Sequence, residues 1–409
     1  QLHFADQCKN CHDDKVKTFR DTFHGKATSF GFMIAADCAD CHTAHKSRPT
    51  KDPNSTVHPN HLKETCGKCH GNPSSKFIQY SPHMDPAKKD TNPVVHIMYS
   101  FMEFLLVGVM LGFGIHTLLW LQRAIVAYFR GEIKKEDEGP FVRRFSKKTI
   151  VLHITVVISF LGLAMTGLPL KYFDIGWTNW LIPVLGGIEV TRFIHRFLAV
   201  VTFGYAAFHV LSIFKETILK KRYSLLWGPK SLVPRMKDLT DLLDNFRWFL
   251  YLGKPPAFGR WAYFEKFDYF AVFWGVPVIG LSGLMLWFPR FFTTLLPGYF
   301  LNIATLVHSE EALLATAFIF TVHFFHNHLR PENFPMDISI FTGKITLKRF
   351  QHERPEEYEE IVRTGRLNEL LTDPPSDEVR RRCFIFGTIS LVIGLLLALG
   401  IIISYVIRF

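Results

Sequence analysis

The chain has 409 residues, of which 48% are apolar, so it is too long to form one small domain. Its formal net charge of +11 would suit a nucleic-acid-binding protein, but Lys and Arg concentrate in three segments, 121–148, 215–260 and 329–382, which separate long apolar stretches. We therefore expect two or three structural units and no basic surface that would require a nucleic acid as partner.

Residues 1–93 are rich in Lys, Asp, His, Pro and Ser, and they contain three copies of Cys-x-x-Cys-His. This spacing is typical of c-type haem attachment, in which the two cysteines bond to the porphyrin and the histidine binds the iron. Zinc also binds paired Cys-x-x-Cys motifs, but it does not require a histidine after each second cysteine. We predict three covalent c-type haems, which carry electrons and supply the core that this polar segment lacks. The motifs comprise Cys8, Cys11 and His12; Cys38, Cys41 and His42; and Cys66, Cys69 and His70.

Each c-type haem iron needs a second axial ligand from outside the motifs. The stretches His24-Gly25-Lys26, Cys38 to His45 and Thr65 to His70 resemble segments of multihaem c-type cytochromes, and this resemblance implies His24 and His45 as distal ligands. His83 is the next candidate, with His61 as a substitute and Met84 as a weaker alternative that would raise the reduction potential. The other histidines available for this role in or beside the segment are His3, His58 and His96.

From Val94 onward, six apolar stretches approach the ~20 residues that a helix needs to cross a bilayer. The loops between them alternate, because 172–191 and 289–302 are nearly free of the Lys and Arg that crowd the other three. The positive-inside rule assigns the basic loops to the cytoplasm and residues 1–93 to the opposite side. Since c-type haem attachment implies the outside of the bacterial cytoplasmic membrane, we predict a multi-pass inner-membrane protein with a periplasmic N-terminal domain. The six stretches are Val94–Trp120, Thr149–Leu170, Arg192–Phe214, Asp268–Phe288, Ile303–Phe325 and Cys383–Ile407.

Two of the apolar stretches each carry a pair of histidines. His195 and His209 lie on the third, and His308 and His323 lie on the fifth. At 3.6 residues per turn, each pair returns to within about 40–60° of one helix face, ~21 Å apart along the axis. Because ionisable residues inside a membrane are costly and usually functional, we predict two stacked b-type haems. The outer haem would bind His195 and His308, and the inner haem would bind His323.

Residues 142–328 resemble the cytochrome b (gamma) subunit of respiratory formate dehydrogenases and nickel–iron hydrogenases. The resemblance rests on Arg144-Phe145-Ser146, His153, Thr166-Gly167-Leu168 and the stretches Arg192 to His195 and His308 to His323. It implies a four-helix di-haem bundle in which His153 pairs with His323. The cytochrome b of quinol:cytochrome c complexes instead implies His209 as the partner, so both remain open. The histidine left over would contact a quinone, pack, or bind a third haem with His116 or His326.

The expected fold is an all-α membrane protein with six transmembrane helices and a small, loop-rich head. We expect a trihaem c-type domain at 1–93, a first transmembrane helix at 94–130, the di-haem b bundle at 142–328, a cytoplasmic segment at 329–382 and a last transmembrane helix at 383–409.

Haems inside and outside a membrane imply a lipid-soluble electron carrier, menaquinone or ubiquinone, with His153, His209 and Glu310 as candidates for its site. We predict electron transfer between this quinone pool and periplasmic redox partners, in a direction that the sequence does not encode. The alternative is an electron-conducting membrane anchor for a larger complex, whose periplasmic partner would be a cytochrome or an iron–sulfur, molybdenum or hydrogenase subunit. A haem sensor without turnover is the third interpretation.

Overall fold

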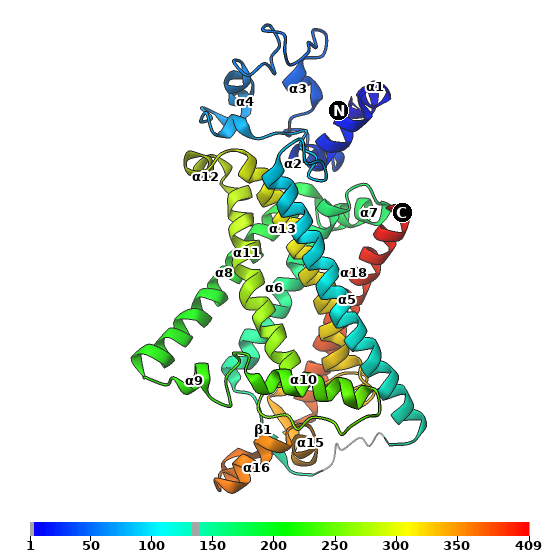
Figure 1. Cartoon of the computed structure of the whole chain (residues 1–409), viewed down its shortest axis with the longest axis vertical. Helices are drawn as coiled ribbons and strands as arrows, with labels where there is room; N and C mark the ends of the chain where they lie inside the picture. The colour runs from blue at the N-terminus through cyan, green and yellow to red at the C-terminus, as the bar shows by residue number, and fades with distance from the viewer. Residues whose placement is uncertain (1–3, 133–138, 409) are drawn as a thin grey trace.

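The computed structural model describes residues 4–132 and 139–408. The described chain contains six helices that are long and apolar enough to cross a membrane, which confirms the predicted multi-pass membrane protein. Figure 1 shows them as one upright bundle with a small head (residues 4–92) at one end. They are α5 (Pro93–Phe129), α6 (Lys147–Lys171), α8 (Gly187–Phe214) with the π-helical turn η2 (Lys215–Leu219), α11 (Tyr263–Trp287), α13 (Tyr299–Phe318) with the π-helical turns η3 (Ile319–His323) and η4 (Phe325–Leu329), and α18 (Asp377–Arg408).

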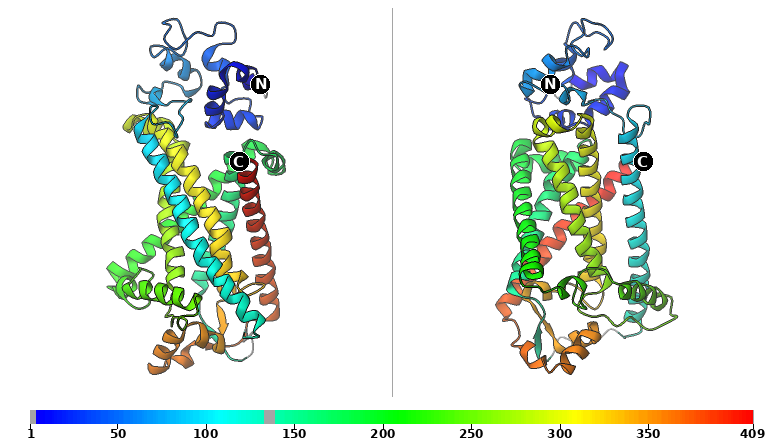
Figure 2. Two further views of the ribbon diagram at one scale, coloured as in Figure 1. Left: turned by 45° about the vertical axis from the view of Figure 1, so that its right-hand side comes forward. Right: turned by 60° about the vertical axis from the view of Figure 1, so that its left-hand side comes forward.

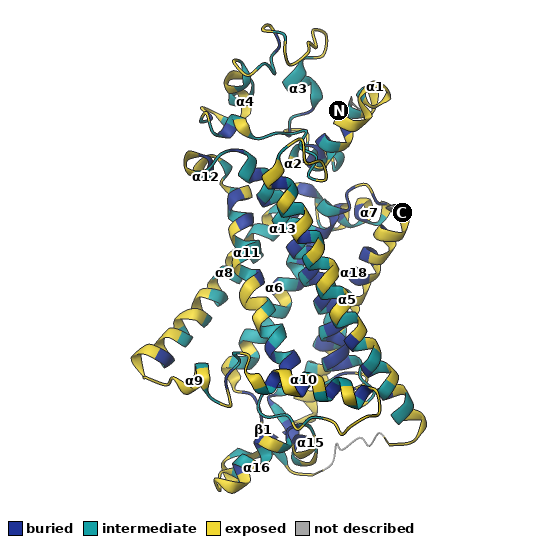
Figure 3. Ribbon diagram, viewed as in Figure 1, coloured by how far each residue is buried: buried dark blue, intermediate teal, exposed yellow. Residues whose placement is uncertain are grey.

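Two helix pairs form the centre of the bundle, because α6 packs along α8 and α11 packs along α13. The helix α5 runs beside α13, and α18 covers α6 and η3 on the other side (Figure 2). Many apolar side chains on the outside of the bundle remain exposed, among them Phe104, Leu118 and Phe193 (Figure 3). Such a surface matches a lipid environment, where apolar side chains face outward and helices satisfy their own backbone hydrogen bonds.

The head is a set of short helices joined by long loops, as expected for a segment with few apolar residues. Its helices are α1 (Phe4–Arg20), α2 (Phe23–Ser29), α3 (Cys38–His42), α4 (Leu62–His70) and η1 (Phe77–Gln79). Each Cys-x-x-Cys-His copy lies on one of them. The helix α3 consists of the motif alone and starts at a capping box, in which the Asp37 side chain accepts from the Ala39 and Asp40 amides and Asp40 accepts from the Asp37 amide.

The head makes direct polar contacts with the adjacent end of the bundle, at α12 (Pro289–Leu295) and the start of α13. The Ser74 hydroxyl donates to the Thr293 carbonyl (3.0 Å), and the Asn302 amide donates to the Ser81 carbonyl (2.9 Å). Gly298 lets the two parts approach closely, because an added Cβ there would lie 2.5 Å from the Lys76 carbonyl oxygen. The head is therefore docked on the bundle and is not held by the linker to α5 alone.

The opposite end of the bundle carries a small cap around a three-stranded antiparallel sheet. The strand β1 (Phe141–Arg143) lies between β2 (Lys344–Thr346) and β3 (Leu371–Thr372), with Phe141 opposite both Thr346 and Thr372. The sequence-based boundary at residue 328 had separated β1 from its partners, whereas the structure joins them. Short helices complete this end: α9 (Ser224–Trp227), α10 (Met236–Phe249), α14 (Ser339–Thr342), α15 (Leu347–Glu353), α16 (Pro355–Arg363) and α17 (Leu367–Leu370); α7 (Gly176–Val184) lies at the head end.

A chain of histidine pairs as the candidate cofactor site

One cavity of about 2730 Å³ extends from the head through the bundle to the cap. An ordinary small-molecule pocket measures roughly 300–1,000 Å³, so this space can hold several large groups. Its wall contains motif cysteines from all three copies and many of the histidines singled out in the sequence. The lining histidines are His12, His24, His42, His70, His83, His153, His195, His209, His308, His323, His326 and His328.

Within residues 4–132 and 139–408, no three His, Cys, Asp or Glu side chains converge to hold a bare metal ion. Haem binding requires only one protein ligand on each face of the iron, so pairs of histidines are the relevant geometry.

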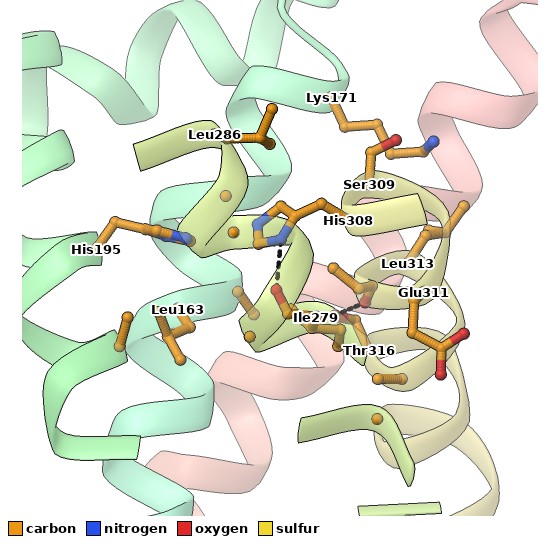
Figure 4. Close-up of a pocket in the computed structure, with 18 of the residues that line it drawn as sticks. Leu163, Lys171, His195, Ile279, Leu286, His308, Ser309, Glu311, Leu313 and Thr316 are labelled. Carbon is orange, nitrogen blue, oxygen red and sulfur yellow. Dashed lines mark hydrogen bonds between the residues drawn. The ribbon is translucent and has the colours of Figure 1, made fainter. Parts of the chain in front are cut away.

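The His195 and His308 side chains point toward each other inside the bundle (Figure 4). Their ring centroids lie 6.2 Å apart at an interplanar angle of 67°. Two imidazoles that bind opposite faces of one metal through bonds of about 2 Å have centroids roughly 6 Å apart. The two rings therefore already have the separation that an iron between them requires.

Hydrogen bonds fix which nitrogen of each ring faces the gap. The Nδ1 atom of His308 donates to the Ile279 carbonyl (2.9 Å), and Nδ1 of His195 lies 2.8 Å from the Thr166 hydroxyl. With Nδ1 occupied on both rings, Nε2 is the atom left for a metal, and such outer contacts orient metal-binding histidines in general.

The two anchoring sites repeat each other on α6 and α11. On α11, Ile279 supplies the carbonyl, Ser282 lies 3.4 Å from His308 Nδ1, and Gly283 makes room for the ring. On α6, Leu163, Thr166 and Gly167 hold the same relative positions beneath His195. Thr166-Gly167-Leu168 was singled out from the sequence, but its counterpart Ser282-Gly283-Leu284 was not, although the shared order of a hydroxyl residue, Gly and Leu was a usable signal. Each half of the bundle thus supplies one histidine and one support for it.

The head contains two further pairs of histidine rings with a similar separation and a smaller interplanar angle, 46° and 41°. The rings of His24 and His70 lie 6.0 Å apart, and those of His42 and His83 lie 6.3 Å apart. Each pair joins one motif histidine to one of the histidines proposed from sequence as distal ligands. The Nδ1 atom of His83 lies 3.1 Å from the Lys15 carbonyl, which turns its Nε2 away from the backbone of α1.

Burial lowers the pKa of each of these four head histidines below its ordinary value. In His24 the neighbouring charge of His70 lowers the pKa further, and Asp40 opposes this effect. All four rings are therefore neutral at pH 7, which is the state that binds a metal.

The motif cysteines of successive copies lie close to one another. Burial and the neighbouring Cys8 raise the pKa of Cys38 to about 11, and burial and the neighbouring Cys66 raise that of Cys41 to about 11. The second motif therefore adjoins the first on one side and the third on the other, and none of these cysteines forms a disulfide.

The remaining head histidines include one more close pair, because the rings of His58 and His61 lie 6.3 Å apart. Neither residue belongs to a Cys-x-x-Cys-His motif, and neither lines the cavity. In the part of the chain that the structure describes, neither His12 nor His45 has a ring contact with another histidine, and His45 is exposed. His61 is bonded to the Pro53 carbonyl (3.0 Å), and His96 to the Pro86 carbonyl (3.1 Å). His3 lies outside the described residues, so the distal ligand of the His12 site stays a prediction.

At the cap end, a hydrogen bond orients the His323 ring, but neither of its candidate partner histidines contacts that ring among the described residues. The Nδ1 atom of His323 lies 2.7 Å from an Asp268 carboxylate oxygen, an arrangement common behind metal-binding histidines. His153 interacts electrostatically with His323, whereas Nε2 of His209 is occupied by the Tyr269 hydroxyl at 2.8 Å. Of the two partners that the sequence left open, His209 has its Nε2 occupied, and the choice between the two for an inner haem stays a prediction.

His116 and His326 also meet, but in a packed environment. Their centroids lie 5.3 Å apart, and the rings of Trp120, Phe249 and Phe264 surround them. Both residues are at most 3% exposed, and His116 bonds to the Tyr263 hydroxyl. A third haem between these two rings would require the aromatic side chains to move apart.

Glu310, a candidate for the quinone site, forms a 2.7 Å ion pair with Lys171. The next residue, Glu311, is 5% exposed and lines the cavity. Its Oε2 atom has no hydrogen-bond donor among the described residues. Glu310 is therefore engaged in an ion pair, whereas Glu311 is the buried acid with one oxygen that has no donor among the described residues.

No protein-family model matches the chain, and no curated protein matches it.

Proposed function

We propose that this protein transfers electrons between a membrane quinone pool, of menaquinone or ubiquinone, and redox partners on the head side, through b-type haems in the bundle and c-type haems in the head. One observation carries the proposal. Three histidine pairs, each about 6 Å apart, line a single cavity that joins the bundle to the head. Two of these pairs contain the histidine of a Cys-x-x-Cys-His motif, and the third lies between helices that cross the membrane.

The residues fit this cofactor in three ways. The paired rings leave room for an iron between them. In the His195–His308 pair, hydrogen bonds hold both Nδ1 atoms and leave Nε2 for the metal. Motif cysteines line the same cavity. Haem iron bound between such rings would carry one electron at a time. The protein residues orient the rings, exclude water with the apolar bundle, and set the order of the sites.

Charge supports a bacterial inner-membrane location with the head in the periplasm. The basic segments 121–132, 215–260 and 329–382 all belong to the cap end of the bundle, opposite the head (Figure 1). The positive-inside rule makes that end cytoplasmic.

We propose the quinone site beside the inner haem, where the cavity contains His209, Tyr269 and Asp268. A hydroxyl–imidazole pair of this kind can bind a quinone oxygen and exchange its proton. Quinol oxidation would release two electrons to the haems and two protons to such groups.

The test uses the purified full-length chain in detergent or liposomes. Addition of a menaquinol or ubiquinol analogue should first reduce b-type and then c-type absorption bands. Absence of any haem reduction by both quinols, in protein that dithionite does reduce, would contradict the proposal.

A further inference from the structure

Arg192 at the head end of α8 connects the membrane histidines to the head. Its guanidinium carbon lies 5.1 Å from the Phe23 ring centroid and 4.9 Å from that of Phe32, which are cation–π distances. Arg192 precedes His195 by three residues, about 4.5 Å along the helix axis. Phe23 precedes His24, and the two rings are 6.5 Å apart. Arg192, which lies one helical turn from His195, and its ring contact with Phe23 therefore link the helix of the His195–His308 pair to His24.

The other member of the head pair, His70, also lies against the bundle. Gly71 follows it with a φ of +68°, and an added Cβ there would lie 3.4 Å from the Arg290 guanidinium. The Phe77 ring lies 4.8 Å from the His70 ring, and the Ser74 hydroxyl ties this segment to α12. Both histidines of the His24–His70 pair are thus flanked by residues that touch the bundle.

The His42–His83 pair is placed differently. His83 approaches the bundle through Ser81 and Asn302, but its ring is bonded to α1, and His42 interacts electrostatically with His12. The second motif also adjoins the first through Cys38 and Cys8. This pair therefore lies between the His24–His70 pair and the His12 site.

We propose that His24–His70 is the head pair that exchanges electrons with His195–His308, and that Arg192 is the residue that positions it. Electrons then continue through His42–His83 to His12. This inference rests on the function proposed above. With haem bound by these residues, each step would pass one electron from a reduced site to an oxidised one, and no bond would be made or broken.

The order is tested by removing one distal ligand at a time from the full-length protein. After the b-type haems are reduced with a quinol analogue, stopped-flow spectra follow the c-type bands in H24A and H83A. We expect H24A to lose the fast reduction of every c-type haem, and H83A to keep a fast phase from one haem. Electron paramagnetic resonance should show one altered haem in each variant, and dithionite should still reduce all three c-type haems.

The role of Arg192 is tested with R192L, R192K and N302A, the last of which removes a head–bundle contact on the His83 side. R192L should slow c-type reduction severalfold, because the rate of electron transfer falls as the two haem sites move apart. R192K, which keeps the cation, should restore much of the rate, and N302A should leave it unchanged. Haem content and reduction potentials should be the same in all three variants.

A fast phase that survives in H24A and disappears in H83A would overturn the proposed order alone. So would slow transfer in N302A with normal transfer in R192L. Failure of the unaltered protein to pass any electron from b-type to c-type haems would overturn the proposed function and this inference together.

Discussion

A methyl group at position 283 tests the geometry of the bundle pair most sharply. The Cβ of an alanine there would lie 3.0 Å from Cε1 and 3.2 Å from Nδ1 of His308. Ordinary contacts between carbon atoms are about 3.5–4.0 Å, so the ring must shift by roughly half an ångström. That shift lengthens the 2.9 Å bond to the Ile279 carbonyl and turns Nε2 away from His195.

The expected loss follows from that hydrogen bond. A hydrogen bond contributes about 0.5–1.5 kcal/mol, and loss of an orienting contact behind a metal ligand typically lowers metal affinity by about 10–100-fold. We expect G283A to weaken binding of the outer b-type haem, the one predicted between His195 and His308, about tenfold, at the low end of that range. G283V adds more volume at the same place and should remove this haem.

The assay is the ratio of extractable to covalently bound haem, measured by pyridine haemochrome spectra. G112A on α5 is the matched control, because a Cβ at Gly112 meets nothing within 4 Å. It should keep the full haem content. Unchanged extractable haem and an unchanged spectrum in G283V would refute the reasoning.

Three further outcomes are expected. H153A should remove the inner extractable haem and H209A should retain it, as counted by the same spectra, since only His209 already has its Nε2 occupied. H61A should leave all c-type haem spectra unchanged. Although burial would raise the pKa of Asp337, Arg349 holds it down to about 2. The stabilising effect of this 2.6 Å pair is therefore complete above about pH 4 and lost as pH falls towards 2. D337A should lower the free energy of unfolding at pH 7 by about 2 kcal/mol, as measured by thermal unfolding in detergent. This is less than the loss for an unpaired buried charge, because Arg349 keeps its bonds to Glu353 and Asn333.

The local sequence patterns predicted the elements well, because they depend on residues that are close along the chain. Six apolar stretches became six long helices, and the histidines at helical spacing came to face one cavity. Helical periodicity cannot say which residues of a neighbouring helix support a ring, so Ser282 and Gly283 were missed. The pairing of β1 with β2 joins residues about 200 positions apart and has no local signal either.

The head was harder to predict for a different reason. Its loops have no periodicity, so the sequence offered seven histidines for the distal positions without a geometric choice among them. The structure brings His24 to His70 and His83 to His42, each across more than forty residues, and leaves His45 exposed.

The most direct test of the account is a pyridine haemochrome spectrum combined with the intact mass of the purified chain. We predict three covalently attached haems, visible as added mass, and two extractable b-type haems. A colourless protein of unmodified mass, or one that contains zinc in place of iron, would contradict the central claim that the histidine pairs hold iron porphyrin.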